Sequence, residues 1–334
     1  MVFMRIAIVK LSALGDIVHA MVVLQFIKKF NQEISIDWFV EEGFKDLLEF
    51  HPDINKVHLI KMKQASKKKS LFALFTVFKK LRKLSSYDLV IDMQGLIKSA
   101  IISKLIPSSQ TLGFDKFSVR EGPASFFYNK KFACDYDKNI IQRNIELVEF
   151  AIGFRVSKKH IQNKDPFLFS KNEQFDINLS STKKNILLIP GASHKSKYYP
   201  TTKLAELSTL INANFVVIWG NSKEEKLAIK IKELSPRVNI SPKISLNSLV
   251  LLISSVDLVI GPDTGPTHFS WALNIPSITL FGSTPGYRNT YQTKINRIIE
   301  SSSHVNPKKI NKADLSIKDI DVSEISIVAK QLLR

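Results

Sequence analysis

The chain has 334 residues, with 48 Lys or Arg against 30 Asp or Glu, so its formal net charge is +18. Because one domain usually has ~100–200 residues, we expect two domains. The 44% hydrophobic and 23% charged residues are ordinary for a globular protein and exclude a disordered or collagen-like chain. A single cysteine excludes a disulfide framework and a cysteine zinc site.

No membrane-spanning or secretory segment is predicted. Apolar runs all fall short of the ~18–20 residues that cross a bilayer, and Arg5, Lys10 and Asp16 interrupt any signal-peptide apolar region. We therefore expect a soluble, cytoplasmic protein.

The positive charge is concentrated in one stretch. Between Lys61 and Tyr87 the sequence has nine basic residues and no acidic one, and from Leu71 to Leu81 its apolar residues have helical spacing. Such a helix buries an apolar stripe and exposes a basic face. That face is either simply solvated or contacts an anionic membrane surface or acceptor.

Two series of short strands alternate with helices along the chain. In the first series we expect strands at 5–10, 35–40, 56–60 and 89–92, and helices at 16–30, 70–84, 95–105 and 140–151. In the second we expect strands at 185–190, 215–219, 258–260 and 277–281, and helices at 201–210, 223–234, 246–254 and 264–273. This alternation favours an α/β protein whose parallel sheets are covered on both faces.

The two series are separated by a polar stretch in which the alternation lapses. We place a linker at 166–182, a first domain at 1–165 and a second at 183–321. A terminal helix at 322–334 is expected, in a position to pack back on the first domain.

Several well-known motifs are absent from the sequence. No G-x-G-x-x-G follows the first strand, and no G-x-x-x-x-G-K-[ST] occurs, which argues against a nicotinamide dehydrogenase and a P-loop NTPase. The seven histidines are scattered, with no H-E-x-x-H motif, so no protein-bound catalytic metal is expected.

One candidate site follows the first strand, where ligands bind in open α/β sheets. Ser12, Gly15 and Asp16 lie between this strand and the next helix. Gly15 permits a tight turn, and Asp16 is either an N-cap, worth roughly 1 kcal/mol, or a functional carboxylate.

Three further candidates follow strands of the second series. In the segment 191–200, Lys195 and Lys197 either neutralise a phosphate or form a solvated basic loop. In the segment 219–225, Glu224 either accepts the hydroxyls of a ribose or is an ordinary acidic residue at a helix start.

The third segment, 261–268, lies at the start of a helix. Its backbone N–H groups and the hydroxyls of Thr264 and Thr267 suit a phosphate-type anion, with Asp263 either as the N-cap of the helix or as a hydrogen-bond acceptor that orients the loop. The alternative is a capped helix without a ligand. Taken together, the four segments predict a nucleotide-diphosphate site in the second domain that faces an acid/base residue across a cleft.

At these residues the chain resembles the heptosyltransferases of lipopolysaccharide inner-core assembly, glycosyltransferase family 9. The S-x-x-G-D-x-x-H segment from Ser12 to His19 and the D-T-G-x-x-H segment from Asp263 to His268 carry the resemblance. The segments 92–100 and 120–129 resemble the branch that adds the first heptose. The resemblance implies the GT-B fold, in which two Rossmann-like parallel-sheet domains face a central cleft.

The resemblance also implies roles for individual residues. Asp16 matches the catalytic base, and Lys197 matches the lysine that binds the donor phosphate. Donor-binding positions are Ser193, Lys197, Glu224, Ile244, Asp263, Thr264, Gly265 and His268. Acceptor-side positions are Ser12, Gly15, Lys98, Arg120, Lys61 and Lys63. The chain departs from the family at Ala192 and Tyr199, where a threonine and a tryptophan are usual, and Ile244 replaces a common methionine.

The implied reaction moves L-glycero-D-manno-heptose from ADP-heptose to the Kdo of Kdo-lipid A with inversion, and needs neither a metal nor another cofactor. A monomer that acts peripherally on the anionic inner face of the inner membrane would fit this role, with no nucleic-acid partner. The closest alternative is a family member that adds the second heptose or another sugar. A non-enzymatic nucleic-acid-binding protein would suit the charge, but the basic stretch lacks interleaved aromatic residues.

Overall fold

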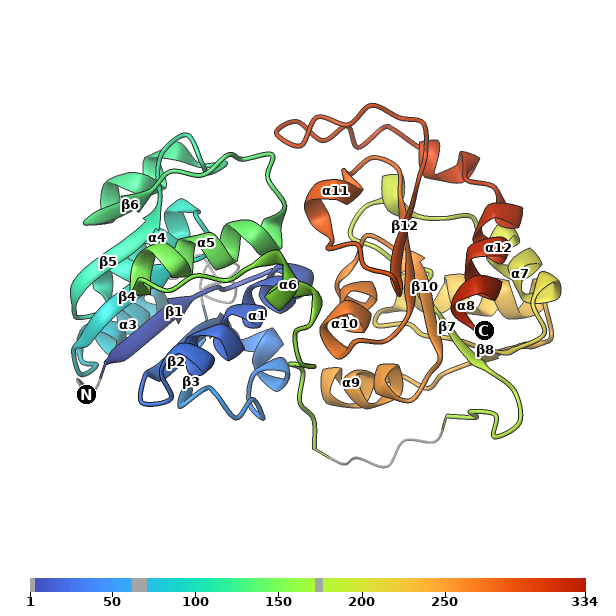
Figure 1. Cartoon of the computed structure of the whole chain (residues 1–334), viewed down its shortest axis with the longest axis horizontal. Helices are drawn as coiled ribbons and strands as arrows, with labels where there is room; N and C mark the ends of the chain where they lie inside the picture. The colour runs from blue at the N-terminus through green and yellow to red at the C-terminus, as the bar shows by residue number, and fades with distance from the viewer. Residues whose placement is uncertain (1–3, 62–70, 172–176) are drawn as a thin grey trace. The chain divides into compact units, whose positions relative to one another are not determined.

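The computed structural model describes residues 4–61, 71–171 and 177–334 (Figure 1). These fall into two compact units, unit 1 at Met1–Phe169 and unit 2 at Ser170–Arg334. The division lies inside the predicted linker.

Unit 1 is built on a parallel six-stranded sheet with the order β3-β2-β1-β4-β5-β6. Its strands are β1 (Arg5–Val9), β2 (Ser35–Glu41), β3 (Lys56–Ile60), β4 (Tyr87–Asp92), β5 (Ser108–Phe114) and β6 (Lys130–Phe132). Its helices are α1 (Leu14–Phe30), α3 (Leu71–Arg82), α4 (Ile97–Leu105), α5 (Ile140–Ile152) and α6 (Lys158–Gln162), with short 3₁₀ turns at Glu42–Leu47 and Gly122–Phe127.

The core of unit 1 lies between its central strands and the helices that cover them. Ala7 and Val9 of β1, with Phe39 and Val90 on the flanking strands, are fully buried. Leu81 of α3 is buried in the same cluster, so the predicted basic helix does place its apolar stripe on the core. The hydrophobic pattern therefore gives α3 the inner face that its sequence predicts.

Unit 2 has a second parallel six-stranded sheet, with the order β12-β11-β10-β7-β8-β9. Its strands are β7 (Asn185–Leu188), β8 (Asn214–Val217), β9 (Val238–Ile240), β10 (Leu258–Pro262), β11 (Ser277–Phe281) and β12 (Asn296–Glu300). Its helices are α7 (Thr201–Leu210), α8 (Ser222–Leu234), α9 (Leu246–Ser254), α10 (Gly265–Leu273), α11 (Gly286–Asn289) and α12 (Val322–Leu332), with 3₁₀ turns at Lys195–Lys197 and Ser316–Asp319.

The last helix, α12, packs within unit 2 beside α7 (Figure 1). Ile325 and Ala329 of α12 are fully buried in the unit 2 core. Just before α12, the carbonyl of Ile320 accepts a hydrogen bond from the buried hydroxyl of Tyr199 at 3.0 Å. The apolar face of α12 is therefore used within unit 2, to which these residues belong.

Among the described residues, no helix combines the length and the apolar character that a membrane crossing requires.

Candidate functional site

The predicted donor residues of unit 2 lie along one edge of its sheet. Because all six strands are parallel, their carboxyl ends meet at the same edge, where open α/β sheets bind ligands. Asp263 follows β10, Lys197 follows β7, Glu224 follows β8 and Ile244 follows β9. Since β10, β7, β8 and β9 are successive neighbours in the sheet, the fold places the four segments side by side.

Asp263 is the centre of a buried hydrogen-bond cluster. Its Oδ1 lies 3.0 Å from His268 Nε2, which donates because a carboxylate only accepts. Its Oδ2 accepts from Lys197 Nζ at 2.7 Å, from the hydroxyl of Thr284 at 2.8 Å and from the amide of Asn289 at 3.1 Å. Hydrogen bonds to both oxygens therefore fix the orientation of the Asp263 carboxylate.

The electrostatics of this cluster keep Asp263 ionised. Burial alone would raise the pKa of Asp263, but the charge of Lys197 and the hydrogen bond from His268 hold that pKa well below its usual range. The negative charge of this carboxylate, which alone would repel a diphosphate, is offset by the ammonium of Lys197: the side chain of Asp263 is 7% exposed and that of Lys197 15%. Asp263 is a buried partner of Lys197.

Lys197 keeps one hydrogen for a ligand. Its ammonium donates to the backbone carbonyl and to the carboxylate of Asp263, at 3.1 and 2.7 Å. An ammonium has three N–H groups, so the third can donate to a phosphate oxygen at this edge. The loop that carries Lys197 is itself held down, because the buried Ser283 hydroxyl donates to Ser196 Oγ at 3.0 Å.

The amino end of α10 adds backbone donors to the same edge. Thr264 is the N-cap residue and its side chain makes no capping hydrogen bond, while Pro266 in the first turn has no N–H group. The backbone N–H groups of Gly265 and Thr267 remain in the first turn, at the positive end of the helix. Thr267 turns its hydroxyl inward to the carbonyl of Pro262, so it is not the anion ligand its sequence position suggested.

Glu224 lies over the turns that follow β7 and β8. Its Oε2 accepts from the backbone N–H of Gly220 at 2.8 Å. A Cβ atom added to Gly191 would lie 2.5 Å from Glu224 Cδ and 2.7 Å from Oε1, so a larger residue there would displace the Glu224 carboxylate. Asn221, not Glu224, caps α8, which leaves the carboxylate of Glu224 to face the sheet edge.

The remaining predicted donor residues have fewer contacts. Ser193 is exposed in the loop before Lys197, and Ile244 is half-buried in the loop after β9. Both lie at the carboxyl edge of the sheet, next to the loops of Lys197 and Glu224.

Thr284 and Asn289 are site residues that the sequence analysis missed. Both belong to the segment after β11, the strand that neighbours β10. The strand at 277–281 was predicted. Because ligand-binding loops follow parallel strands, the loop after this strand could have been predicted as part of the site.

In unit 1, Asp16 lies in the first turn of α1 at the corresponding sheet edge. The N-cap residue is Ala13, and Asp16 is the third residue of the helix. Asp16 Oδ2 accepts the backbone N–H of Ala13 at 3.1 Å. Asp16 therefore stabilises the helix start from inside the first turn. Its carboxylate is half-buried, and Oδ1 is not used in this hydrogen bond.

The loop that carries Ser12 is held by Gln94, which follows β4. Gln94 Oε1 accepts the backbone N–H groups of Leu11 and Ser12, at 3.0 and 3.1 Å. Gln94 is positioned in turn because its own N–H donates to the buried Asp92 at 2.8 Å. The segments after β1 and β4 thus form one connected edge, and Gln94 is a residue that our predicted site omitted.

The predicted acceptor-side cations differ in whether they form ion pairs within the protein. Lys98 pairs with Glu41, and Lys61 pairs with Glu42 at 2.7 Å. Arg120 is exposed, with no ion pair to another described residue. Lys63 lies outside the described residues. Gly15, the second residue of α1, is half-buried beside Asp16.

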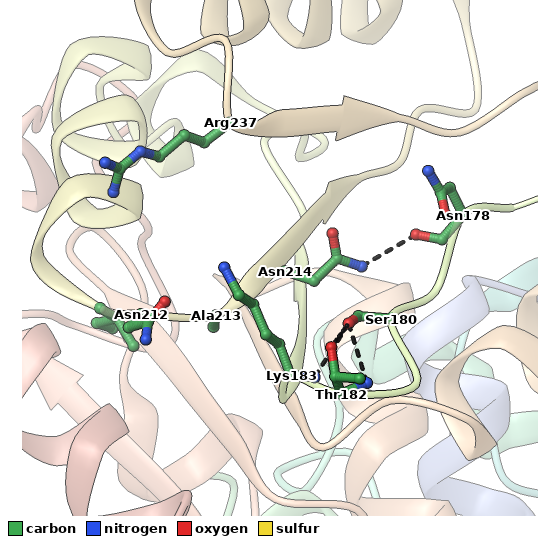
Figure 2. Close-up of a pocket in the computed structure, with 9 residues that line it drawn as sticks. Asn178, Ser180, Thr182, Lys183, Asn212, Ala213, Asn214 and Arg237 are labelled. Atoms are coloured by element: carbon green, nitrogen blue, oxygen red, sulfur yellow. Dashed lines mark hydrogen bonds between the residues drawn. The ribbon is translucent and has the colours of Figure 1, made fainter.

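A separate hollow of about 560 Å³ lies at the opposite edge of the unit 2 sheet (Figure 2). Lys183 and Arg237 line it with several polar side chains, and Asn214 donates to the carbonyl of Asn178 at 3.0 Å. Asn214 also accepts from Asn239 at 3.0 Å, so these amides bond to each other and to the backbone. The hollow lies beside the starts of strands β7, β8 and β9, and none of the predicted donor residues lines it.

No group of three His, Cys, Asp or Glu side chains within the described ranges is arranged to hold a metal ion.

Known proteins resemble this chain over nearly its whole length. The family model of glycosyltransferase family 9 (heptosyltransferase) matches residues 74–316. Lipopolysaccharide heptosyltransferase 1 of Campylobacter coli is 41% identical and is matched over 98% of this chain and 99% of its own. The E. coli heptosyltransferase WaaC with ADP has a TM-score of 0.80 at 24% identity, covering 98% of this chain and 100% of that one. The same E. coli protein with ADP-2-deoxy-2-fluoro heptose has a TM-score of 0.78 at 24% identity, covering 98% and 99%.

The two parallel α/β units and these structural similarities show the GT-B fold, as the sequence predicted. The candidate site residues lie in the loops and helix starts at the carboxyl edges of the two sheets. The chain belongs to glycosyltransferase family 9, the heptosyltransferases. Family membership favours an enzyme over the nucleic-acid-binding alternative.

Proposed function

We propose that the protein transfers L-glycero-D-manno-heptose from ADP-heptose to the Kdo of Kdo-lipid A, with inversion at the anomeric carbon and without a metal ion. Family membership and the similarity to a lipopolysaccharide heptosyltransferase 1 support heptose transfer in the synthesis of the lipopolysaccharide inner core. The observation that carries the donor half of the proposal is the buried Asp263–Lys197 pair beside the amino end of α10.

The donor is proposed to bind at the carboxyl edge of the unit 2 sheet. Lys197 and the first-turn N–H groups of α10 would meet the diphosphate, and Glu224 would accept hydrogen bonds from the ribose hydroxyls. Ile244, which lies after the neighbouring strand, suits the apolar face of the adenine. Similarity to the E. coli heptosyltransferase with ADP-2-deoxy-2-fluoro heptose supports a nucleotide-heptose donor.

In the proposed reaction, the acceptor oxygen forms a bond to the anomeric carbon while the bond from that carbon to the phosphate oxygen breaks. The electron pair of the broken bond leaves with ADP, whose developing negative charge Lys197 and α10 would stabilise. The proton of the acceptor hydroxyl would pass to Asp16. Attack opposite to the leaving group inverts the anomeric carbon.

The acceptor is proposed to bind at the carboxyl edge of the unit 1 sheet. Arg120, which forms no ion pair with another described residue, would meet a carboxylate or phosphate of the acceptor there, whereas Lys98 and Lys61 are held by glutamates. Because Kdo-lipid A is an anionic lipid, we propose that the protein works peripherally on the cytoplasmic face of the inner membrane. The basic face of α3 would contribute ~1 kcal/mol per cation near such a surface.

The test is incubation of the purified protein with ADP-heptose and Kdo-lipid A, followed by mass spectrometry of the lipid. Addition of one heptose supports the proposal, and α/β assignment by NMR of the product checks inversion. Transfer only to an acceptor that already carries one heptose would contradict it and support a second-heptose transferase. Equal activity after treatment with a chelator would support metal independence.

A further inference from the structure

The most exposed large apolar side chains of the described residues gather in unit 1. Phe126 is 78% exposed, Phe117 73% and Phe75 63%. Single exposed apolar residues are ordinary, but phenylalanine side chains in water at this level are costly when they recur on one part of a molecule. Whether these phenylalanines form a binding surface therefore depends on where they lie in the fold.

All three lie on segments that connect parallel strands of unit 1. Phe117 follows β5, and Phe126 is in the 3₁₀ turn after the same loop. The loop is closed on itself, because a Cβ atom on Gly122 would lie 3.0 Å from the carbonyl oxygen of Lys116. Phe75 is near the amino end of α3, and a helix that connects two parallel strands begins at their carboxyl edge.

Cations accompany these aromatic rings. Lys116 and Arg120 are exposed on the same loop, and Lys116 Nζ lies 4.6 Å from the centre of the Phe117 ring. Lys79 and Lys80 are exposed on α3, one turn beyond Phe75. Protruding phenylalanines flanked by lysine and arginine match a bilayer interface, where rings enter among the acyl chains and cations meet lipid phosphates.

We propose that Phe75, Phe117 and Phe126 form an aromatic docking surface through which unit 1 enters an anionic lipid bilayer. The occupant is the bilayer itself, because positive charge surrounds rings that no other described element covers. This inference deepens the proposed function: it names the residues that bring the acceptor edge, with Asp16 and Arg120, to the membrane that holds the lipid acceptor.

The first experiment measures flotation of the full chain with vesicles of phosphatidylcholine, with or without phosphatidylglycerol. The double variant Phe117→Ser, Phe126→Ser should bind the anionic vesicles at least ~10-fold more weakly than the wild type, since each ring loses apolar burial. A matched control, Ile229→Ser with Ile327→Ser, removes two exposed apolar side chains from unit 2 and should bind as the wild type does.

A second experiment asks whether the ring itself enters the lipid. Phe117→Trp should retain vesicle binding, and its fluorescence should shift to shorter wavelength with anionic vesicles beyond any shift of the wild type. Equal vesicle binding by the wild type and the Phe117→Ser, Phe126→Ser variant would overturn the inference, as would no vesicle binding at all. An equal loss in the Ile229→Ser, Ile327→Ser control would also overturn it.

Activity separates this inference from the proposed function. The Phe117→Ser, Phe126→Ser variant should lose transfer to vesicle-embedded acceptor while it retains transfer to a delipidated, soluble Kdo acceptor. If neither acceptor receives heptose from the wild type, the proposed function fails, yet ring-dependent vesicle binding would still support the docking surface. If transfer occurs but the aromatic substitutions change neither activity nor binding, only the docking surface fails.

Discussion

The ammonium of Lys197 donates to both the backbone carbonyl and the carboxylate of Asp263, at 3.1 and 2.7 Å. The two residues are 66 positions apart and follow neighbouring strands, β7 and β10. The pair therefore joins the cation proposed to bind phosphate to the loop at the start of α10. It also gives Lys197 a structural role in addition to its proposed role in binding the sugar donor.

The double role of Lys197 gives the first prediction. Lys197→Ala leaves the buried carboxylate of Asp263 without its cation, so the free energy of unfolding should fall by about 3–5 kcal/mol. The same variant should lose most transfer activity. Denaturant unfolding and transfer kinetics measure the two effects.

A double variant separates stability from catalysis. Lys197→Met combined with Asp263→Asn removes both charges and should recover most of the stability, but activity should stay low because the cation for the diphosphate is gone. Recovery of activity together with stability would contradict a donor role for Lys197.

The second prediction concerns the proposed base. Asp16→Asn retains an oxygen for the backbone N–H of Ala13, so stability should hardly change. Asparagine cannot accept the proton of the acceptor hydroxyl, so transfer should be at least ~10²-fold slower while ADP binding is unchanged. Calorimetry with ADP and single-turnover kinetics test these expectations, and near-normal turnover would assign Asp16 to the helix start alone.

The third prediction uses the close contact of Gly191 with Glu224. An alanine Cβ at position 191 must displace the carboxylate, so Gly191→Ala should raise the KM for ADP-heptose about as much as Glu224→Ala does, roughly 10-fold, with a smaller change in kcat. Gly43→Ala is the control, because nothing lies within 4 Å of the added Cβ. A donor KM that stays normal in both site variants would exclude Glu224 from the ribose contact.

The fourth prediction is a pH dependence of stability. Burial lowers the pKa of His51 to about 4, and its ring packs edge-on against Phe169 with centroids 4.9 Å apart. Because the unfolded chain binds the proton below about pH 6.5 and the folded one does not, stability should fall as the pH drops from about 6.5 toward 4, by about 2–3 kcal/mol.

His51→Phe should remove that part of the acid sensitivity. Denaturant titrations at neutral and mildly acidic pH measure it, with the exposed His304→Ala as the control. If the wild type and His51→Phe lose stability in parallel, His51 is not the group that titrates.

The sequence predicted the central strands of both sheets because they are short, apolar and bounded by polar residues. It did not predict β5, which begins with Ser-Ser-Gln-Thr, or the strands β6, β9 and β12 toward the sheet edges. Edge strands bury fewer side chains, so they lack the continuous apolar run on which the prediction depends.

The candidate site was predicted loop by loop, but its contacts were not. The rule that ligands bind after parallel strands located Asp263, Lys197 and Glu224. The ion pair between Asp263 and Lys197 depends on strand order, because β7 and β10 are far apart in sequence and adjacent in the sheet. The pairing of Lys98 with Glu41 was hidden for the same reason.

The hydrogen bond from Tyr199 to Ile320 can form only late in the synthesis of the chain. Tyr199 lies two residues beyond Lys197, and its partner carbonyl, like the α12 helix that covers α7, is made more than a hundred residues later. Unit 1 obtains all of its strands within the first 169 residues and can fold while synthesis continues. The Lys197 loop acquires its last support only when residues 320–332 have left the ribosome.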